Sequence, residues 1–363
     1  MAQGDNPKKV FVAATMQDQG KTTVCLGLMA AFQRRRPPVC FMKPVGQRYV
    51  ELDGARVDED VALLNAIFPS GAALGDMSPV TVGRSFTRDY IRHPRGEALT
   101  RRIADAFARL SAGKGFVVIE GTGHAGVGSC FDTSNADVAA LLGAKVILVT
   151  SGGIGKPIDE VMLNESLFRD RGCEMLGVVL NKVLPEKLEE IRQVVAAGLG
   201  RKGIALLGCI PYEPLLANPT MQHVFEELPC EALCGADRLH NIFDSVVVGA
   251  MAAPRAMMYV EPGCLLITPG DREDLLEAVV DSDKGPAMSG VLLTGGTRPH
   301  PLVMRRFEAA GLPVLLVDSD SYTAAAAVHG LKVKILPADG AKIAAGRRIV
   351  SEHVDLDRIM EKA

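Results

Sequence analysis

Short apolar runs and amphipathic stretches alternate along the first two thirds of the chain. Runs with the composition of buried strands occupy residues 10–14, 39–45, 116–119, 145–150, 177–182 and 204–211. Apolar residues recur at helical spacing in residues 22–32, 61–68 and 191–199. This alternation predicts a doubly wound α/β domain with a mostly parallel sheet.

The pattern loosens between Tyr212 and His240, where three prolines interrupt it. A second α/β pattern follows, with strands predicted at residues 265–268, 290–294 and 313–317, each running into a polar or glycine-rich loop. Such loops suggest either a crevice for a small ligand or a subunit contact. We predict domains at residues 1–225 and 244–345, a linker at 226–243 and a C-terminal helix at 346–363.

The turn between the first strand and the first helix carries a phosphate-loop pattern. It ends in Gly20-Lys21-Thr22, in which backbone N–H groups face phosphates, the lysine neutralises their charge and the hydroxyl binds Mg²⁺. Thr15 stands where the pattern has its first glycine. The alternative is a chance match on a surface turn, but the strand before it and the helix after it favour nucleotide binding. A P-loop NTPase-type fold is therefore expected.

Polar residues at other strand ends point to the same crevice, because ligands of open parallel sheets collect at the carboxyl ends of strands. Lys43 ends the second strand, although a surface lysine before a turn fits equally well. Glu120 ends a buried strand, where a carboxylate needs a cation or hydrogen bonds. Asn181 ends a later strand and could bond an adenine. The predicted nucleotide contacts are Thr15, Gln17, Gln19, Gly20, Lys21, Thr22, Thr23 and Asn181.

Composition limits the partners that the chain can have. Of 363 residues, 40 are basic and 43 acidic, giving a net charge of −3, which favours neither nucleic acid nor an anionic membrane. No run approaches the roughly 18 apolar residues of a membrane span. The eight cysteines are scattered, and Cys230-x-x-x-Cys234 alone is weak support for zinc. Buried, reduced thiols in the cytoplasm are therefore expected.

Several motifs together resemble a known family. Ala14-Thr15-x-x-x-x-Gly20-Lys21-Thr22, Lys43-Pro44-Val45, Glu120-Gly121-x-Gly123 and Gly208-x-Ile210-Pro211 are similar to dethiobiotin synthetase, in the same order, over about the first 220 residues. The later motifs Pro269-Gly270-Asp271-Arg272 and Leu293-Thr294-Gly295-Gly296-x-Arg298-Pro299 resemble a DRTGG domain. The pair resembles the N-terminal region of long bacterial phosphotransacetylases and their stand-alone relatives. Their catalytic domain is expected to follow, and this sequence ends before it, at Ala363.

The resemblance implies roles for individual residues. Lys21 and Thr22 would contact phosphate and Mg²⁺, with Glu120 and Asp60 as further magnesium ligands. Lys43 matches the lysine that assists the carbamate in dethiobiotin synthetase, so Lys21 and Lys43 are the predicted catalytic residues. From the residues alone, however, Asp58-Glu59-Asp60 is better explained as the acidic start of a helix. A homodimer is also implied.

The chain also departs from that family. Ala14 replaces the first glycine of the loop, and Met16-Gln17-Asp18-Gln19 differs from the family's loop. Residues 151–156, Ser-Gly-Gly-Ile-Gly-Lys, replace the segment that receives the substrate carboxylate in dethiobiotin synthetase. Met16 also stands where partitioning ATPases carry a signature lysine. The nucleotide half of the site is kept and the substrate half is not.

Three functions are compatible with these motifs. The first is a regulatory protein that binds ATP and Mg²⁺ and couples this to a DRTGG domain sensing an unidentified small metabolite, with a partner enzyme of the phosphotransacetylase type. The second is an ATP-dependent carbon–nitrogen ligase in which Lys43 stabilises a carboxylate or carbamate attacking the γ-phosphate. The third is a scaffold with a decayed site. We favour the first, which leaves open whether ATP is turned over.

Overall fold

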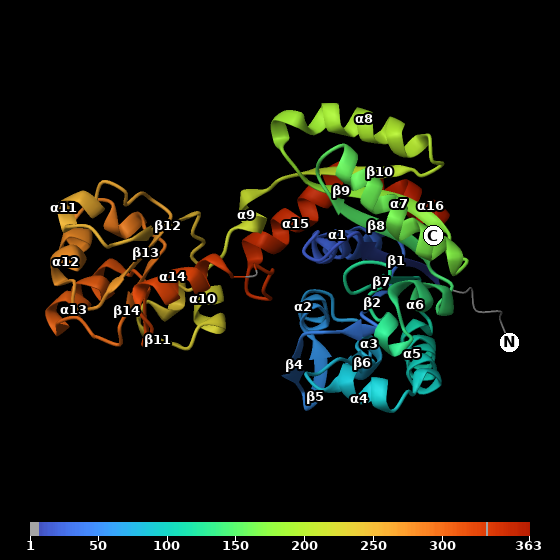
Figure 1. The fold of residues 1–363 in the computed structure, drawn as a ribbon, viewed down its shortest axis with the longest axis horizontal. Coiled ribbons are helices and arrows are strands. Elements are labelled where there is room, and N and C mark those ends of the chain that lie inside the picture. Colours follow the sequence, from blue (N-terminus) through green and yellow to red (C-terminus); the bar gives the residue numbers. More distant parts are fainter. Residues whose placement is uncertain (1–6, 332) are drawn as a thin grey trace. The chain divides into compact units, whose positions relative to one another are not determined.

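The chain forms two units, each built around a sheet. The computed structural model describes residues 7–331 and 333–363. The first unit comprises Met1–Glu213 together with Gly340–Ala363, and the second comprises Pro214–Asp339 (Figure 1). The expected α/β fold, with a mostly parallel central sheet and a smaller second α/β domain, is confirmed.

The central sheet of the first unit has the strand order β10-β9-β8-β1-β7-β2, and all of its neighbouring strands run parallel. Its strands are β1 (Lys8–Ala14), β2 (Val39–Met42), β7 (Phe116–Glu120), β8 (Lys145–Ser151), β9 (Met175–Val183) and β10 (Leu206–Pro211). The central strands are almost wholly apolar because helices cover both of their faces. Since the register pairs Val12 with Glu120 and Ser151 with Asn181, the polar ends of these strands meet at one edge.

Helices and two small sheets complete the N-terminal part of this unit. The helices are α1 (Lys21–Arg35), α2 (Glu59–Ile67), α3 (Leu74–Met77), α4 (Phe86–Arg92), α5 (Gly96–Ser111), α6 (Asn135–Leu141), α7 (Gly155–Asp170) and α8 (Leu188–Gly200). The small sheets pair β3 (Val45–Gly46) with β6 (Val80–Thr81), and β4 (Tyr49–Leu52) with β5 (Ala55–Asp58). No helix in residues 7–331 or 333–363 is both long enough and apolar enough to span a membrane.

The C-terminal segment belongs to the first unit, which differs from the expected boundaries. Two helices, α15 (Gly340–His353) and α16 (Leu356–Lys362), replace the single predicted helix at 346–363. Helix α15 packs on α1, where Val350 fills the space left by the missing side chain of Gly27. The sequence pattern did not show that this segment returns to the first unit, where Lys342 is buried.

The second unit is built on a sheet of order β11-β15-β14-β13-β12. Its strands are β11 (Cys230–Cys234), β12 (Ser245–Val248), β13 (Cys264–Pro269), β14 (Gly290–Thr294) and β15 (Val314–Val317), with helices α9 (Pro214–Ala217), α10 (Met221–Glu227), α11 (Ala253–Ala256), α12 (Glu273–Asp281), α13 (Pro301–Ala310) and α14 (Ser321–His329). Strands β12 to β15 run parallel, and β11 runs antiparallel to β15. Alternate residues of β13 enter separate apolar clusters, Leu266 in one and Leu265 in the other, so both faces of the sheet are buried.

Residues 226–243, expected to be a linker, contribute to this sheet. They contain β11, whose Cys230 pairs with Val317. The short strand escaped the sequence pattern because Pro229 precedes it and its run of apolar residues is interrupted by Glu231. The second unit therefore begins earlier than predicted, at Pro214.

Candidate functional site

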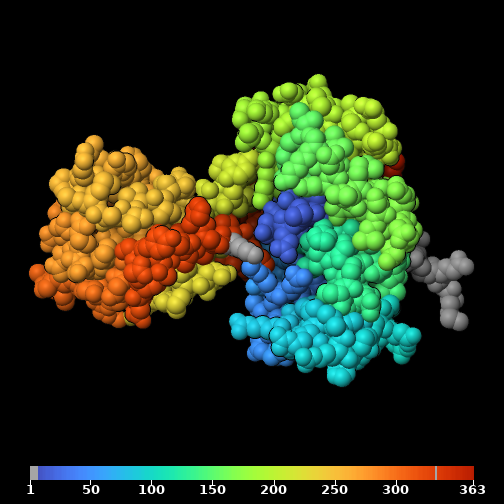
Figure 2. Space-filling view, viewed as in Figure 1, coloured from blue at the N-terminus to red at the C-terminus, as the bar shows by residue number. Residues whose placement is uncertain are grey.

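The loop between β1 and α1 forms an open helix N-terminus. Gly20 precedes α1 with a φ of 88°, a backbone conformation that suits glycine, and no side chain caps the helix. The first N–H groups of a helix have no partner within it, so they can bind an anion. Dark blue atoms at the position of α1 are visible on the face drawn in Figure 2. This N-terminus has the form of a phosphate site.

Neighbouring strand ends hold this loop in place. Ala14 N–H donates to Gly123 O at 3.1 Å and Thr15 N–H donates to Val149 O at 2.9 Å. Asn181 Nδ2 donates to Gln19 O at 2.9 Å, and Lys182 Nζ donates to Asp18 O at 2.8 Å. The loop is therefore fixed by residues near the carboxyl ends of β7, β8 and β9, as an anion site needs for preorganisation.

Lys21 begins α1 and is buried. No ion pair within the described part of the chain involves Lys21, whereas Lys43 has three. Burial lowers the pKa of Lys21, and the positive charge of Lys43 adds to that effect, while Glu120 and Asp60 act against it. Among the residues that the structure describes, Lys21 is therefore a buried cation without a direct carboxylate partner, which suits a ligand that brings its own negative charge.

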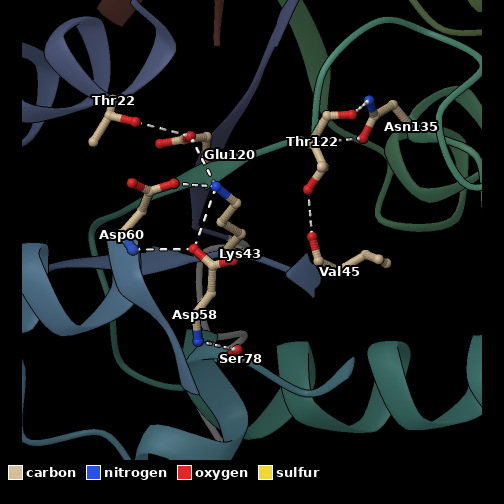
Figure 3. Close-up of polar contacts among 9 residues, drawn as sticks. All are labelled: Thr22, Lys43, Val45, Asp58, Asp60, Ser78, Glu120, Thr122 and Asn135. Atoms are coloured by element: carbon tan, nitrogen blue, oxygen red, sulfur yellow. Dashed lines mark hydrogen bonds and ion pairs between the residues drawn. The ribbon is translucent and has the colours of Figure 1, made fainter. Parts of the chain in front are cut away.

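Lys43 lies at the centre of an acidic cluster (Figure 3). Its Nζ contacts the Asp60 carboxylate and stands 3.3 Å from Asp58 Oδ1 and 3.2 Å from Glu120 Oε1. Burial acts to lower the pKa of Lys43, but attraction by Asp60, Glu120 and Asp58 outweighs it and raises the pKa well above its usual range. Lys43 is therefore a charged ammonium held by three buried carboxylates.

Glu120 connects this cluster to the phosphate loop. Its Oε1 accepts a hydrogen bond from Thr22 Oγ1 at 3.2 Å and another from Lys43 Nζ at 3.2 Å. Its Oε2 is buried and has no hydrogen-bond partner among residues 7–331 and 333–363. Burial raises the pKa of Glu120 to about 7, even though Lys43 pulls it downward. A buried oxygen without a partner needs a proton, water or cation.

The oxygen donors present fit a magnesium ion. Mg²⁺ binds through one or two carboxylates, phosphates and water, so the Thr22 hydroxyl and the unpartnered oxygen of Glu120 are suitable ligands. The described residues contain no group of three or more His, Cys, Asp or Glu arranged to hold a metal without other ligands. Bound Mg²⁺ would neutralise phosphate charge beside Lys21. The predicted set of Thr22, Asp60 and Glu120 lies together, but Asp60 joins it through Lys43.

Other predicted nucleotide contacts face the protein itself. Thr15 Oγ1 donates to Glu160 Oε2 at 2.8 Å and lies 2.9 Å from Thr150 Oγ1. Gln19 Nε2 donates to Gln17 O at 3.3 Å. Asn181 bonds the loop, as described above, and Thr23 lies in the first turn of α1. For these residues, contact with a nucleotide remains a prediction.

Sequence reasoning missed three residues that support the site. Asp58 caps α2 by accepting from Asp60 N–H at 3.0 Å while also holding Lys43. Asn135 Nδ2 donates to Thr122 O at 2.8 Å and His124 O at 2.7 Å, and Asn164 Oδ1 accepts from Ala125 N–H at 2.8 Å.

Local signals could have identified two of these residues. Asp58 opens the acidic start of a helix, and Asn135 directly follows the capping residue Ser134. Asn164 lies in the middle of α7 and has no such signal.

The sequence matches two family models. Residues 8–220 match an AAA domain, and residues 223–331 match a DRTGG domain. The chain is 29% identical over 359 residues to the phosphate acetyltransferase of Nitratidesulfovibrio vulgaris, covering 95% of this chain and 50% of that protein. It is 25% identical over 366 residues to the phosphate acetyltransferase of Synechocystis, covering 97% and 51%. The chain thus spans about half the length of the curated relatives it matches.

A solved structure of a ParA family ATPase from Chlorobium tepidum is also similar, at 13% identity over 61% of this chain and 88% of that one, with a TM-score of 0.36. That likeness is too weak to carry an argument about function.

The family matches confirm the expected P-loop domain, the DRTGG domain and the relation to phosphotransacetylases, which are phosphate acetyltransferases. The chain belongs to the AAA domain family (AAA_26) and joins that domain to a DRTGG domain.

Proposed function

We propose that the chain binds ATP with Mg²⁺ at the carboxyl edge of the first sheet and uses this binding to regulate a partner. The observation that carries the proposal is the uncapped N-terminus of α1 beside Lys21, a buried cation that forms no ion pair within the described residues. Phosphates satisfy both the free N–H groups and the ammonium. Thr22 and Glu120 would hold Mg²⁺ at the same place.

The regulatory role rests on the second unit and on the relatives. A DRTGG domain follows the AAA domain here, and the relatives that share both are phosphate acetyltransferases roughly twice as long. We propose that the second unit senses a small metabolite, that the chain forms a homodimer and that it acts on an enzyme of the phosphotransacetylase type. Regulation of this kind requires that nucleotide bind two states of the protein with different affinity.

The ligase alternative is not proposed. Neither of the relatives described above is a carbon–nitrogen ligase. In addition, Lys43, which would have to neutralise a substrate carbamate, already forms ion pairs with three carboxylates.

The binding proposal is tested by calorimetric titration with ATP and ADP, with and without Mg²⁺. Lys21→Met should weaken ATP binding at least tenfold, because charged hydrogen bonds to phosphate are worth about 1.5–3 kcal/mol. Thr22→Ala should retain metal-free binding and lose the gain that Mg²⁺ provides. Lys202→Met, which removes an exposed lysine, is the matched control. Equal affinity in Lys21→Met and the control would refute the nucleotide site.

The regulatory part needs a separate measurement. Hydrogen exchange of the full chain with and without ATP–Mg²⁺ should show changed protection in residues 214–339 as well as in the first unit. Changes confined to the first unit would contradict regulation while leaving ATP binding intact. Phosphate release stimulated by a carboxylic or diamino acid would instead restore the ligase alternative.

A further inference from the structure

Lys43 occupies the position of a cation among the carboxylates of the site. Its ammonium group has three N–H donors, and Asp58, Asp60 and Glu120 surround it at 3.3 Å or less. All four residues are at most 7% exposed. A group of buried carboxylates is stable only with compensating charge, and Lys43 supplies it.

Two of these carboxylates, Asp60 and Glu120, are predicted magnesium ligands. Mg²⁺ binds oxygen at about 2.0–2.1 Å, whereas Lys43 Nζ stands 3.2 Å from Glu120 Oε1. An ion bound to Oε1, or to Oε2 of the same carboxylate, would add a second positive charge to a group that Lys43 already neutralises. Thr22 also donates to Glu120 Oε1, so this one oxygen already serves two donors while Oε2 has none among the described residues.

Resting on the proposed function, we propose that Lys43 is the resident counter-ion of the metal site and competes with Mg²⁺ for Asp60 and Glu120. Asp58 lies outside the predicted ligand set, and it keeps Lys43 paired when the other two carboxylates are released. The ammonium therefore exchanges partners within the cluster and remains compensated while the metal enters.

The exchange involves the side chain of Lys43 and leaves its backbone in place. Lys43 N–H donates to Met77 O at 2.8 Å, and Val80 N–H donates to the next carbonyl, Pro44 O, at 3.2 Å. Val45 O accepts from Thr122 Oγ1 at 2.5 Å. These bonds fix the segment after β2, so only the flexible lysine stem has freedom to move.

The test is a titration of the nucleotide-free chain with Mn²⁺ alone, an ion that prefers the same oxygen ligands, with free Mn²⁺ followed by electron paramagnetic resonance. Lys43→Met should bind Mn²⁺ at least tenfold more tightly than the unchanged chain. Lys43→Arg, which keeps the charge, should not gain affinity. Asp58→Asn keeps an oxygen that can cap α2 but removes one of the three carboxylates around Lys43. Lys43 then has only Asp60 and Glu120, so this variant should bind Mn²⁺ more weakly than the unchanged chain.

Removal of Lys43 could prevent folding, and a second measurement covers that outcome. The melting temperature of Lys43→Met should rise with added Mn²⁺, and that of the unchanged chain should respond less. The double variant Lys43→Met with Asp58→Asn, which removes one charge of each sign, should show the same gain. Unchanged or weaker Mn²⁺ binding in both Lys43→Met and the double variant would overturn the proposal. Because no nucleotide is present, these results are independent of whether ATP binds to Lys21.

Discussion

Gly20 and Asn181 lie so close together that a Cβ added to Gly20 would stand 2.1 Å from Asn181 Nδ2. The contact joins the phosphate loop to the end of β9. Gly20 also has a φ of 88°, which L residues rarely adopt. Two independent constraints, space and backbone conformation, therefore require glycine at this position.

Replacing Gly20 with alanine should destabilise the chain and weaken ATP binding, because Asn181 must leave the loop. The strained backbone costs about 1–3 kcal/mol, and the displaced hydrogen bond to Gln19 O adds to it. Gly54→Ala is the matched control, since Gly54 has a φ of 74° but no neighbouring atom within 4 Å of a Cβ. Urea unfolding measures both variants. An equal loss in the two would show that Asn181 does not matter.

Glu120 should make stability depend on pH. Its pKa is raised by burial from 4.5 to about 7, against the pull of Lys43. The folded state then holds the proton more tightly than the unfolded state, so this contribution is fully present below pH 4.5 and is lost as the pH rises through about 7. A shift of one unit corresponds to about 1.4 kcal/mol, so the loss should be a few kcal/mol.

Urea unfolding between pH 5 and about 8 measures this effect, with Glu120→Gln as the comparison. Glutamine does not titrate, so the variant should lose the part of the pH dependence that Glu120 contributes. Identical slopes in the two proteins would exclude Glu120 as the titrating group.

The close contact between Gly27 and Val350 should make the packing of α15 on α1 sensitive to substitution at either residue. A Cβ on Gly27 would stand 2.3 Å from Val350 Cβ, so Gly27→Ala should destabilise the first unit by about 1–3 kcal/mol through overpacking. Gly75→Ala is the control, because Gly75 is also helical and has open space around it. Adding Val350→Gly to Gly27→Ala removes the Cβ of Val350 and should restore part of the loss. No rescue would mean that the strain lies elsewhere.

The positions of the phosphate-loop residues could be predicted because their signals are local. A strand, a turn that ends in Gly20 and a helix follow one another within the first 35 residues, and this order itself places Lys21 and Thr22 at the end of the sheet. Glu120 could be predicted for a similar reason, since an acid that ends an apolar strand indicates a ligand or a partner.

The partners of these residues could not be predicted, because they depend on contacts between distant segments. Lys43 meets Glu120, 77 residues further along the chain, only when β2 and β7 have paired. The return of α15 to α1 depends on glycine at position 27, which has no special meaning in a helical pattern. β11 is short and directly follows a proline, so its pairing with β15 could not be predicted from the sequence.

The two separate segments of the first unit have a consequence for protein synthesis. A chain emerging from the ribosome presents Pro214–Asp339 in full before α15 appears, so the second unit can finish folding first. The face of α1 around Gly27 stays exposed until Val350 has been synthesised. The order of the units along the chain is thus not the order of their completion. A ribosome that stalls after the DRTGG domain would carry a phosphate loop whose supporting helix lacks its final cover.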